Sequence, residues 1–224
     1  MAVVPARGAS KGIPRKNVKP FLGRPLLVWT VEAALESGVG PVLVSTEDEE
    51  IADVARAAGA EVVERPGELA GDEVPTAPAV RHAVESHPSD FVLVLEPTAP
   101  ARRAFQIREA LDLLESSGAD SVAAISQVPY HYTAEKQLRF YRDGSIEALD
   151  GRAVRELTHR RQDVQATFAF NGLVWGCRSE VLHWDTLWGE RVMGYVVDPR
   201  YAIDLDRPED WAPAEARVKE LLDA

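Results

Sequence analysis

Short apolar runs alternate with amphipathic segments along most of the chain. The apolar runs suit buried strands, and the segments between them have the 3.6-residue spacing of helices. Because strands that alternate with helices form parallel sheets through right-handed crossovers, the pattern predicts an α/β fold: a Rossmann-like, mostly parallel sheet with helices on both faces. The expected strands are residues 2–4, 41–46, 62–63, 91–95, 121–126, 168–177 and 192–197, and the expected helices are 25–35, 49–58, 74–87, 105–115 and a C-terminal helix.

The alternation breaks between residues 129 and 165. Residues 138–141 and 145–149 flank Asp143-Gly144, a pair typical of a hairpin turn. We therefore expect one α/β domain, residues 1–128 and 166–224, with an inserted excursion at 129–165. Two strands alone are marginal in water, so the apolar side chains of this hairpin favour a homodimer.

Composition bears on the number of domains and on the cellular location of the protein. The 224 residues, 46% of them hydrophobic, are enough for one sizeable α/β domain. No apolar run approaches the roughly 20 residues of a membrane span, the N-terminal stretch lacks the apolar region of a signal peptide, and the single Cys177 excludes an internal disulfide. We expect a cytoplasmic protein with no membrane partner.

Positive charge is concentrated in the first 31 residues, although the chain as a whole is acidic, with 25 basic and 36 acidic residues. A local basic concentration in an acidic protein favours a small anionic ligand over nucleic acid. Residues 5–17, PARGASKGIPRKN, follow the first strand, where open α/β sheets bind ligands, and Gly8 and Gly12 allow close approach of the backbone. The loop therefore predicts a polyphosphate site, the alternative being a solvated basic loop. It is neither a Walker loop nor GxGxxG. The basic residues that precede the first acid, Glu32, are Arg7, Lys11, Arg15, Lys16, Lys19 and Arg24.

The stretch PARGASKGIPRKN resembles the N-terminal signature of the CMP-sugar synthetases, cytidylyltransferases that activate N-acylneuraminate and related acidic nonulosonic sugars. The resemblance extends along nearly the whole chain. It implies a nucleotidyltransferase fold of the nucleotide-diphospho-sugar type, with CTP and an acidic sugar as substrates and pyrophosphate as the leaving group. It also implies that the excursion builds the dimer interface and reaches the partner's active site.

The resemblance assigns roles to the basic loop. Arg7, Lys11 and Lys16 would hold the triphosphate, and Lys16 is the candidate for stabilising the leaving pyrophosphate. Asn17 would orient a phosphate or the ribose, and Gly8 and Ser10 would contact the nucleotide. Residues 65–72, RPGELAGD, resemble an RPxxLAxD loop that precedes a hydroxyl residue facing cytosine. Thr76 is the nearest match, with an ordinary N-cap threonine as the alternative.

Two further motifs point to the acceptor. Residues 96–102, EPTAPAR, resemble part of LQPTSPLR, but Glu96 stands where the family usually has glutamine, and an ionised carboxylate cannot donate a hydrogen bond. Either Glu96 interacts differently or the substrate differs. Arg102 and Arg103 are either phosphate contacts or charges at a helix start. Asn171 begins an NGxxY-like motif in which Trp175 replaces tyrosine; the asparagine would contact the sugar or ribose, and the tryptophan is more often a core residue.

The run RRQD at residues 160–163 stands at the family's distance from Asn171. We expect Arg161 to hold the acceptor carboxylate, aided by Arg160 and Lys136, because a guanidinium grips a carboxylate through two parallel hydrogen bonds. The alternative is a surface ion pair.

Asp204 and Asp206 lie two residues apart on a segment predicted to be extended, so both side chains share one face. Two facing carboxylates beside substrate phosphates suit Mg²⁺, and IDLDRPED resembles the family's IDIDxPED. Arg7, Lys16 and Asp206 are therefore the predicted catalytic residues, with Asp204 and Asp206 as the metal ligands; two solvated aspartates are the alternative. Histidine and cysteine spacing gives no zinc site. Another acidic acceptor (deoxyoctulosonate, a legionaminate-like sugar or a phosphonate), another nucleobase and a non-catalytic binding domain stay open as alternatives.

Overall fold

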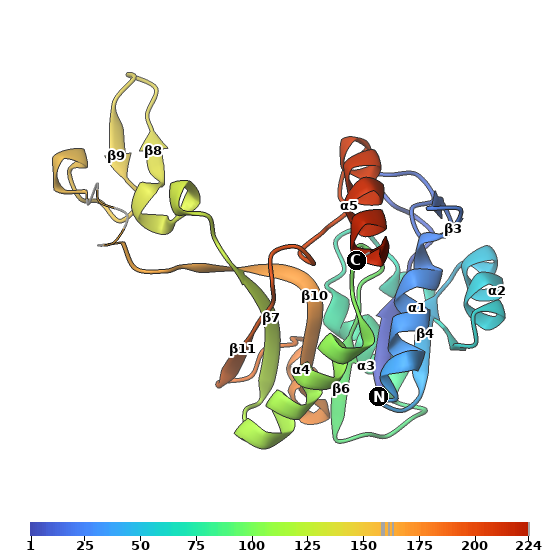
Figure 1. Cartoon of the computed structure of the whole chain (residues 1–224). Coiled ribbons are helices and arrows are strands. Elements are labelled where there is room, and N and C mark those ends of the chain that lie inside the picture. The colour runs from blue at the N-terminus through green and yellow to red at the C-terminus, as the bar shows by residue number, and fades with distance from the viewer. Residues whose placement is uncertain (158–159, 161, 163, 224) are drawn as a thin grey trace.

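The main sheet of the protein has seven strands (Figure 1). The structure is a computed structural model that describes residues 1–157, 160, 162 and 164–223. The strand order is β11-β7-β10-β6-β1-β4-β5. β10 is antiparallel to both of its neighbours, and the other pairs are parallel, which confirms the mostly parallel sheet. The strands are β1 (Ala2–Pro5), β4 (Val42–Thr46), β5 (Glu61–Glu64), β6 (Phe91–Val94), β7 (Ser121–Gln127), β10 (Phe168–Arg178) and β11 (Val192–Val196).

Helices cover both faces of this sheet, as predicted. Because successive strand residues point to opposite faces, Ala2 and Val4 of β1 lie in one core cluster and Val3 in another. The first cluster packs against α1 (Leu26–Ser37), α2 (Glu49–Ala57) and α4 (Ala104–Ser117). The second packs against α3 (Thr76–Val84) and the 3₁₀ segment η6 (Ser179–Trp184). The central strands β1, β4 and β6 are thus buried on both faces, and the carboxyl edge of the sheet is left for a site.

A third apolar cluster lies under the basic loop. It joins Ile13 of that loop, Phe21 of the small β2–β3 hairpin (β2, Pro20–Phe21; β3, Arg24–Pro25) and Leu205 to α5 (Trp211–Asp223). β11 is the last strand of the described chain. Residues 202–206, which the sequence predicts to be extended, alternate between buried and exposed positions but pair with no strand among the described residues; the cluster beneath them holds them in place.

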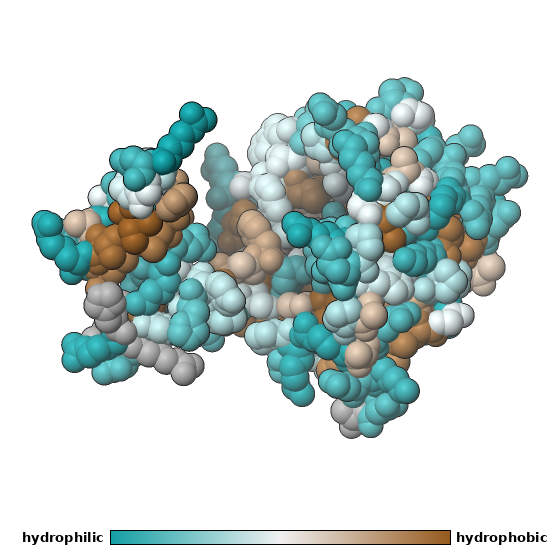
Figure 2. Space-filling view, turned by 90° about the horizontal axis from the view of Figure 1, so that it is seen from above, coloured by the Kyte–Doolittle hydropathy of each residue, from teal (hydrophilic) through white to brown (hydrophobic). Residues whose placement is uncertain are grey.

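The segment after β7 leaves the main sheet and forms a separate two-stranded hairpin, β8 (Leu138–Phe140) and β9 (Ile146–Ala148), as the pattern predicted. Figure 1 shows it projecting away from the α/β body, and apolar side chains gather on its surface (Figure 2). The large apolar residues exposed there are Leu138, Phe140, Tyr141, Ile146 and Leu149. Other short 3₁₀ segments are η1 (Gly67–Leu69), η2 (Tyr130–Tyr132), η3 (Ala134–Lys136), η4 (Val154–Glu156) and η7 (Pro208–Asp210).

None of the described helices has both the length and the apolar character needed to cross a membrane.

Candidate active site

A cleft of about 370 Å³ opens at the carboxyl end of β1 and β6. Four segments that are distant in the sequence meet around it: the basic loop, the connection from β5 to α3, the loop after β6 and the extended segment before α5. The predicted site residues among its lining are Arg7, Ser10, Lys16, Asn17, Thr76, Glu96, Asp204 and Asp206. The fold therefore brings most of the predicted nucleotide and metal residues to one place.

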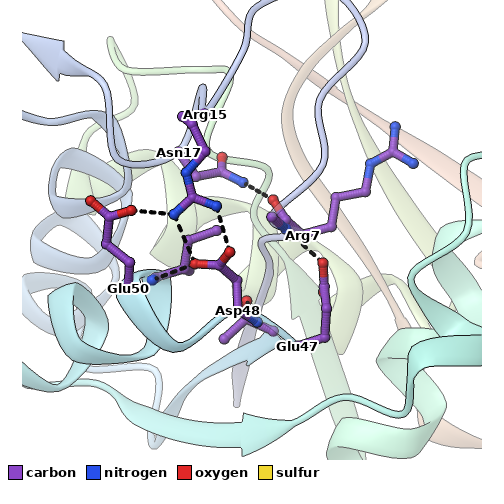
Figure 3. A network of polar contacts seen from close by, with 9 residues as sticks. Arg7, Arg15, Asn17, Glu47, Asp48 and Glu50 are labelled. Atoms are coloured by element: carbon purple, nitrogen blue, oxygen red, sulfur yellow. Dashed lines mark hydrogen bonds and ion pairs between the residues drawn. The ribbon is translucent and has the colours of Figure 1, made fainter.

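Acidic residues that follow β4 anchor the basic loop (Figure 3). Arg15 forms ion pairs with Asp48 and Glu50, and its guanidinium holds the pKa of Asp48 below the usual range through a hydrogen bond. The Gly8 amide donates to Oε1 of Glu47 at 2.7 Å. These contacts fix the backbone of the loop, so Arg15 is a structural cation, and the Gly8 amide is engaged by protein.

The side chain of Asn17 also has a structural bond: its Nδ2 donates to the carbonyl oxygen of Arg7 at 2.9 Å. This bond ties the two ends of the loop together (Figure 3). Asn17 still lines the cleft together with Arg7, so it can both shape the loop and face a ligand.

The loop and the aspartate segment pack directly on each other. A Cβ placed on Gly12 would lie 2.1 Å from the carbonyl oxygen of Asp206, so the close approach requires glycine. Beside it, Nζ of Lys16 donates to the carbonyl oxygen of Leu205 at 2.8 Å. Burial lowers the pKa of Lys16, an effect that the carboxylates of Asp206 and Asp204 oppose.

Asp204 and Asp206 share the exposed face of their segment, because Ile203 and Leu205, which alternate with them, are buried. The Asp204 side chain lines the cleft and is partly surrounded by protein there. This partial burial raises its pKa, a hydrogen bond from Thr98 opposes the rise, and the charge of Asp206 adds to it. The described residues contain no cluster of three or more acidic, histidine or cysteine side chains that could hold a metal. A metal here would need phosphate or water oxygens in addition, which is the usual arrangement for Mg²⁺.

A second cleft, of about 590 Å³, adjoins the first and shares Glu96 and Asp204 with it. Burial raises the pKa of Glu96, and the nearby charge of Asp204 adds to the rise. Asn171 and Trp175 line this second cleft. The two clefts thus meet at a pair of carboxylates.

Asn171 is held in position by its neighbours. Its Nδ2 donates to Oγ of Ser126 at 2.9 Å, and its Oδ1 accepts from the amide of Leu173 at 3.1 Å. Trp175 packs against the core, as expected of a core residue, and also lines the second cleft, beside Phe170 at a centroid distance of 5.2 Å.

Arg102 is not a phosphate contact. Its guanidinium is buried and donates to the carbonyl oxygens of Leu173 and Glu96 and, at 2.9 Å, to Oγ1 of Thr30. Burial lowers its pKa to about 9, and the carboxylates of Glu96 and Asp204 oppose this effect. The side chain therefore ties the loop after β6 to β10 and α1.

Arg103 lies at a helix start, which was the other expectation for it, and lines neither cleft. It precedes α4 at the N-cap position, and its Nη2 donates to the carbonyl oxygen of Leu221 in α5 at 3.1 Å.

Thr76 is the first residue of α3, and the N-cap is Pro75, with no side-chain capping bond. The N-cap alternative for Thr76 was wrong, because the cap position falls one residue earlier; the threonine lines the cleft. Arg65 and Asp72 also line the cleft and were not predicted as site residues, although their loop was. Arg217 of α5, in the second cleft, was not predicted either.

Lys136 and Arg160 lie on the excursion, and neither is among the residues that line the two clefts. Arg161, the predicted carboxylate ligand, lies outside the described residues. The predicted roles of these three residues stay predictions.

The chain is similar to known cytidylyltransferases: a family model described as "Cytidylyltransferase" matches residues 1–163. Two similar relatives are N-acylneuraminate cytidylyltransferase A of Danio rerio, 35% identical over 97% of this chain and 50% of its own length, and N-acylneuraminate cytidylyltransferase of Streptococcus agalactiae, 28% identical over 94% and 51%. The chain thus spans about half the length of the curated relatives it matches.

Solved structures share the fold at low sequence identity. CMP:2-keto-3-deoxy-manno-octonic acid synthetase in complex with CTP superposes with a TM-score of 0.72 at 16% identity, over 100% of this chain and 98% of the other. The 4-diphosphocytidyl-2C-methyl-D-erythritol synthase of Anaerococcus prevotii gives 0.66 at 12% identity, over 97% of both chains. These structures support the nucleotidyltransferase fold.

Proposed function

The chain belongs to the cytidylyltransferase family, and from this premise we propose that it transfers the cytidylyl group of CTP to a hydroxyl of an acidic sugar and releases pyrophosphate. The observation that carries the proposal is the pair of adjoining clefts, one lined by Arg7 and Lys16 and the other by Asn171, which meet at Glu96 and Asp204. A transferase for two substrates needs such a junction, because its reacting atoms must lie within about 3.5 Å of each other.

In this arrangement the nucleotide occupies the first cleft. Arg7, Lys11 and Lys16 hold the triphosphate, Thr76 faces the base, and Ser10 and Asn17 line the phosphate and ribose region. The acceptor hydroxyl enters from the second cleft, loses its proton to solvent and attacks the α-phosphorus in line. The bond from this phosphorus to the bridging oxygen breaks, and the pyrophosphate that leaves takes both bonding electrons. Lys16 stabilises the developing negative charge, since a positioned cation in a partly dry site acts more strongly than one in water.

Mg²⁺ fits this site through Asp204 and Asp206, whose facing carboxylates repel each other and whose remaining coordination positions phosphate oxygens can fill. Bound there, Mg²⁺ would neutralise negative charge on the phosphates. The chain's own contribution is to place the two carboxylates: Ile203 and Leu205 are buried, so the aspartates turn to the cleft.

The names of the relatives support an N-acylneuraminate or a related nonulosonate as the acceptor. A deoxyoctulosonate, a legionaminate-like sugar or a phosphonate is the alternative, since Glu96 departs from the family's glutamine. We keep Arg161, aided by Arg160 and Lys136, as the predicted holder of the acceptor carboxylate. Arg161→Lys should weaken acceptor use and leave the KM for CTP nearly unchanged, because lysine keeps the charge but loses the bidentate fork.

We also propose a homodimer formed through the excursion. In support, Phe140 is 77% exposed and Ile146 48%, on a hairpin with two strands of three residues each. Such a hairpin is marginal alone, and a second copy would cover its apolar surface. The cytoplasmic location expected from the single cysteine stays a prediction.

A pyrophosphate-release assay with CTP, ATP, GTP and UTP against a panel of acidic sugars tests the activity. We expect release with CTP and a carboxylated sugar, only in the presence of Mg²⁺, and none with the neutral counterpart of the sugar. Equal turnover of the four nucleotides, or full activity in excess chelator, would contradict the proposal.

A further inference from the structure

The carboxylate of Asp72 forms ion pairs with two cations that we propose bind the phosphates: Arg7, which lines the cleft, and Lys11, which does not. Its Oδ1 lies 2.6 Å from Nη1 of Arg7, and its Oδ2 lies 3.1 Å from Nζ of Lys11. Each carboxylate oxygen takes one cation, as two oxygens of a phosphate would. Asp72 and Arg7 both line the cleft, so this ion pair lies inside the space that a nucleotide would use.

The connection between β5 and α3 carries Asp72 to this position. Arg65 fixes one end of the connection, since its guanidinium is buried and donates to the carbonyl oxygen of Ser45 at 2.7 Å. The start of α3 fixes the other end. Between them, Gly71, Asp72 and Glu73 are exposed, and in the described part of the chain the ion pairs to Arg7 and Lys11 are what holds the Asp72 side chain. The carboxylate can therefore move away while both ends stay in place.

Glu47 offers an instructive contrast. It also contacts the basic loop, through the amide of Gly8, but it does not line the cleft. Glu47 can keep its hydrogen bond when a ligand enters. Asp72 and a phosphate chain, in contrast, require the same two cations in the same space.

We propose that Asp72 is an internal counter-ion that the phosphate chain of the nucleotide must displace, and that it thereby sets the phosphate charge a ligand needs to bind. The inference rests on the nucleotide site proposed above. A triphosphate carries several negative charges and replaces one carboxylate at Arg7 and Lys11, whereas a nucleoside has no charge with which to replace it. When pyrophosphate leaves, Asp72 returns to Arg7 and Lys11 and competes against its rebinding.

Calorimetric titration of Asp72→Asn with CTP, pyrophosphate and cytidine, each with Mg²⁺, tests the proposal. The exchanged ion pairs are partly exposed and individually weak. We expect about 10-fold tighter binding of CTP and of pyrophosphate, equivalent to about 1.4 kcal/mol, and less than a twofold change for cytidine. Glu68→Gln is the matched control: it removes the same charge from the same connection, from a side chain that does not line the cleft. This control should change all three affinities by less than twofold.

The sign of the effect decides between two roles. If Asp72 instead orients Arg7 and Lys11 for the phosphates, Asp72→Asn must weaken CTP and pyrophosphate binding; weaker or unchanged binding overturns the proposal. Asp72→Ser, with a smaller neutral side chain, must change the CTP and pyrophosphate affinities in the same direction as Asp72→Asn. It replaces that variant in the test if the asparagine variant does not fold. A wild-type protein that binds pyrophosphate but no nucleotide would refute the proposed function alone, and the pyrophosphate arm would still decide the role of Asp72.

Discussion

The contact between the basic loop and the aspartate segment can be broken with a single methyl group at Gly12. In Gly12→Ala the new Cβ would meet the carbonyl oxygen of Asp206 at 2.1 Å, while ordinary contacts begin near 3.4 Å, so the two segments must separate by about 1.3 Å. The partner is backbone, so no side-chain rotation can relieve the clash. The shift would separate Lys16 and Arg7 from the two aspartates. A misplacement of about 1 Å can cost about 100-fold in rate, which is the loss we expect in kcat/KM.

The stability cost should be small in comparison. Overpacking costs about 1–3 kcal/mol, and in a domain of this size each kcal/mol lowers Tm by roughly 2–4 °C. Pyrophosphate release measures the activity, and thermal unfolding measures the stability. Gly67→Ala is the control, because a Cβ at Gly67 meets nothing within 4 Å, and it should leave both quantities unchanged. A Gly12→Ala protein with wild-type kcat/KM would refute the view that this contact sets the geometry of the site.

Three further predictions follow from the same structure. Asp204→Asn or Asp206→Asn should lower turnover at limiting Mg²⁺ by about 100-fold or more, because one metal ligand is lost. Neither substitution should lower Tm, because the repulsion between the two carboxylates is relieved. A variant with wild-type turnover at limiting Mg²⁺ would show that its aspartate is not a metal ligand. Phe140→Asp should give a monomer of 24.6 kDa in light scattering where the wild type gives twice that mass, and a wild-type monomer would contradict the proposed dimer. Cys177 is buried, which raises its pKa to about 12, so it should react with iodoacetamide only on unfolding, and rapid labelling of the native protein would contradict its burial.

The hydrophobic pattern predicted the strands and helices around the main sheet well, because the burial of each element is visible in its own apolar residues. The run FVLVL became β6, where Val92, Leu93 and Val94 are fully buried, and Gly38 ended α1 with φ of 70°. The direction of β10 could not be predicted from its residues: buried parallel and antiparallel strands carry the same apolar side chains, and direction depends on how the chain returns from the excursion.

The site was predictable where the chemistry of a residue, its place after a strand and the family resemblance agreed. Lys16, Asp204 and Asp206 are such cases, and the fold brings them to one cleft. Arg102 and Asp72 could not be assigned in this way, because their roles depend on partners distant in sequence: Leu173 for the arginine, and Arg7 and Lys11 for the aspartate. An arginine at the end of a loop gives no signal that it is buried.

Glu96 changes the charge balance where the two clefts meet. Its carboxylate joins those of Asp204 and Asp206 near Lys16 and the buried Arg102, and the next cation, Arg7, is paired with Asp72, so around Glu96 the negative charges outnumber the positive ones by one. A glutamine at this position would leave the group neutral. Burial is the main reason that the pKa values of Glu96 and Asp204 are raised, and the charge of a neighbouring carboxylate adds to each rise. A divalent cation would offset the excess charge before the phosphates add more, so this imbalance favours Mg²⁺ at the junction independently of the spacing of the two aspartates.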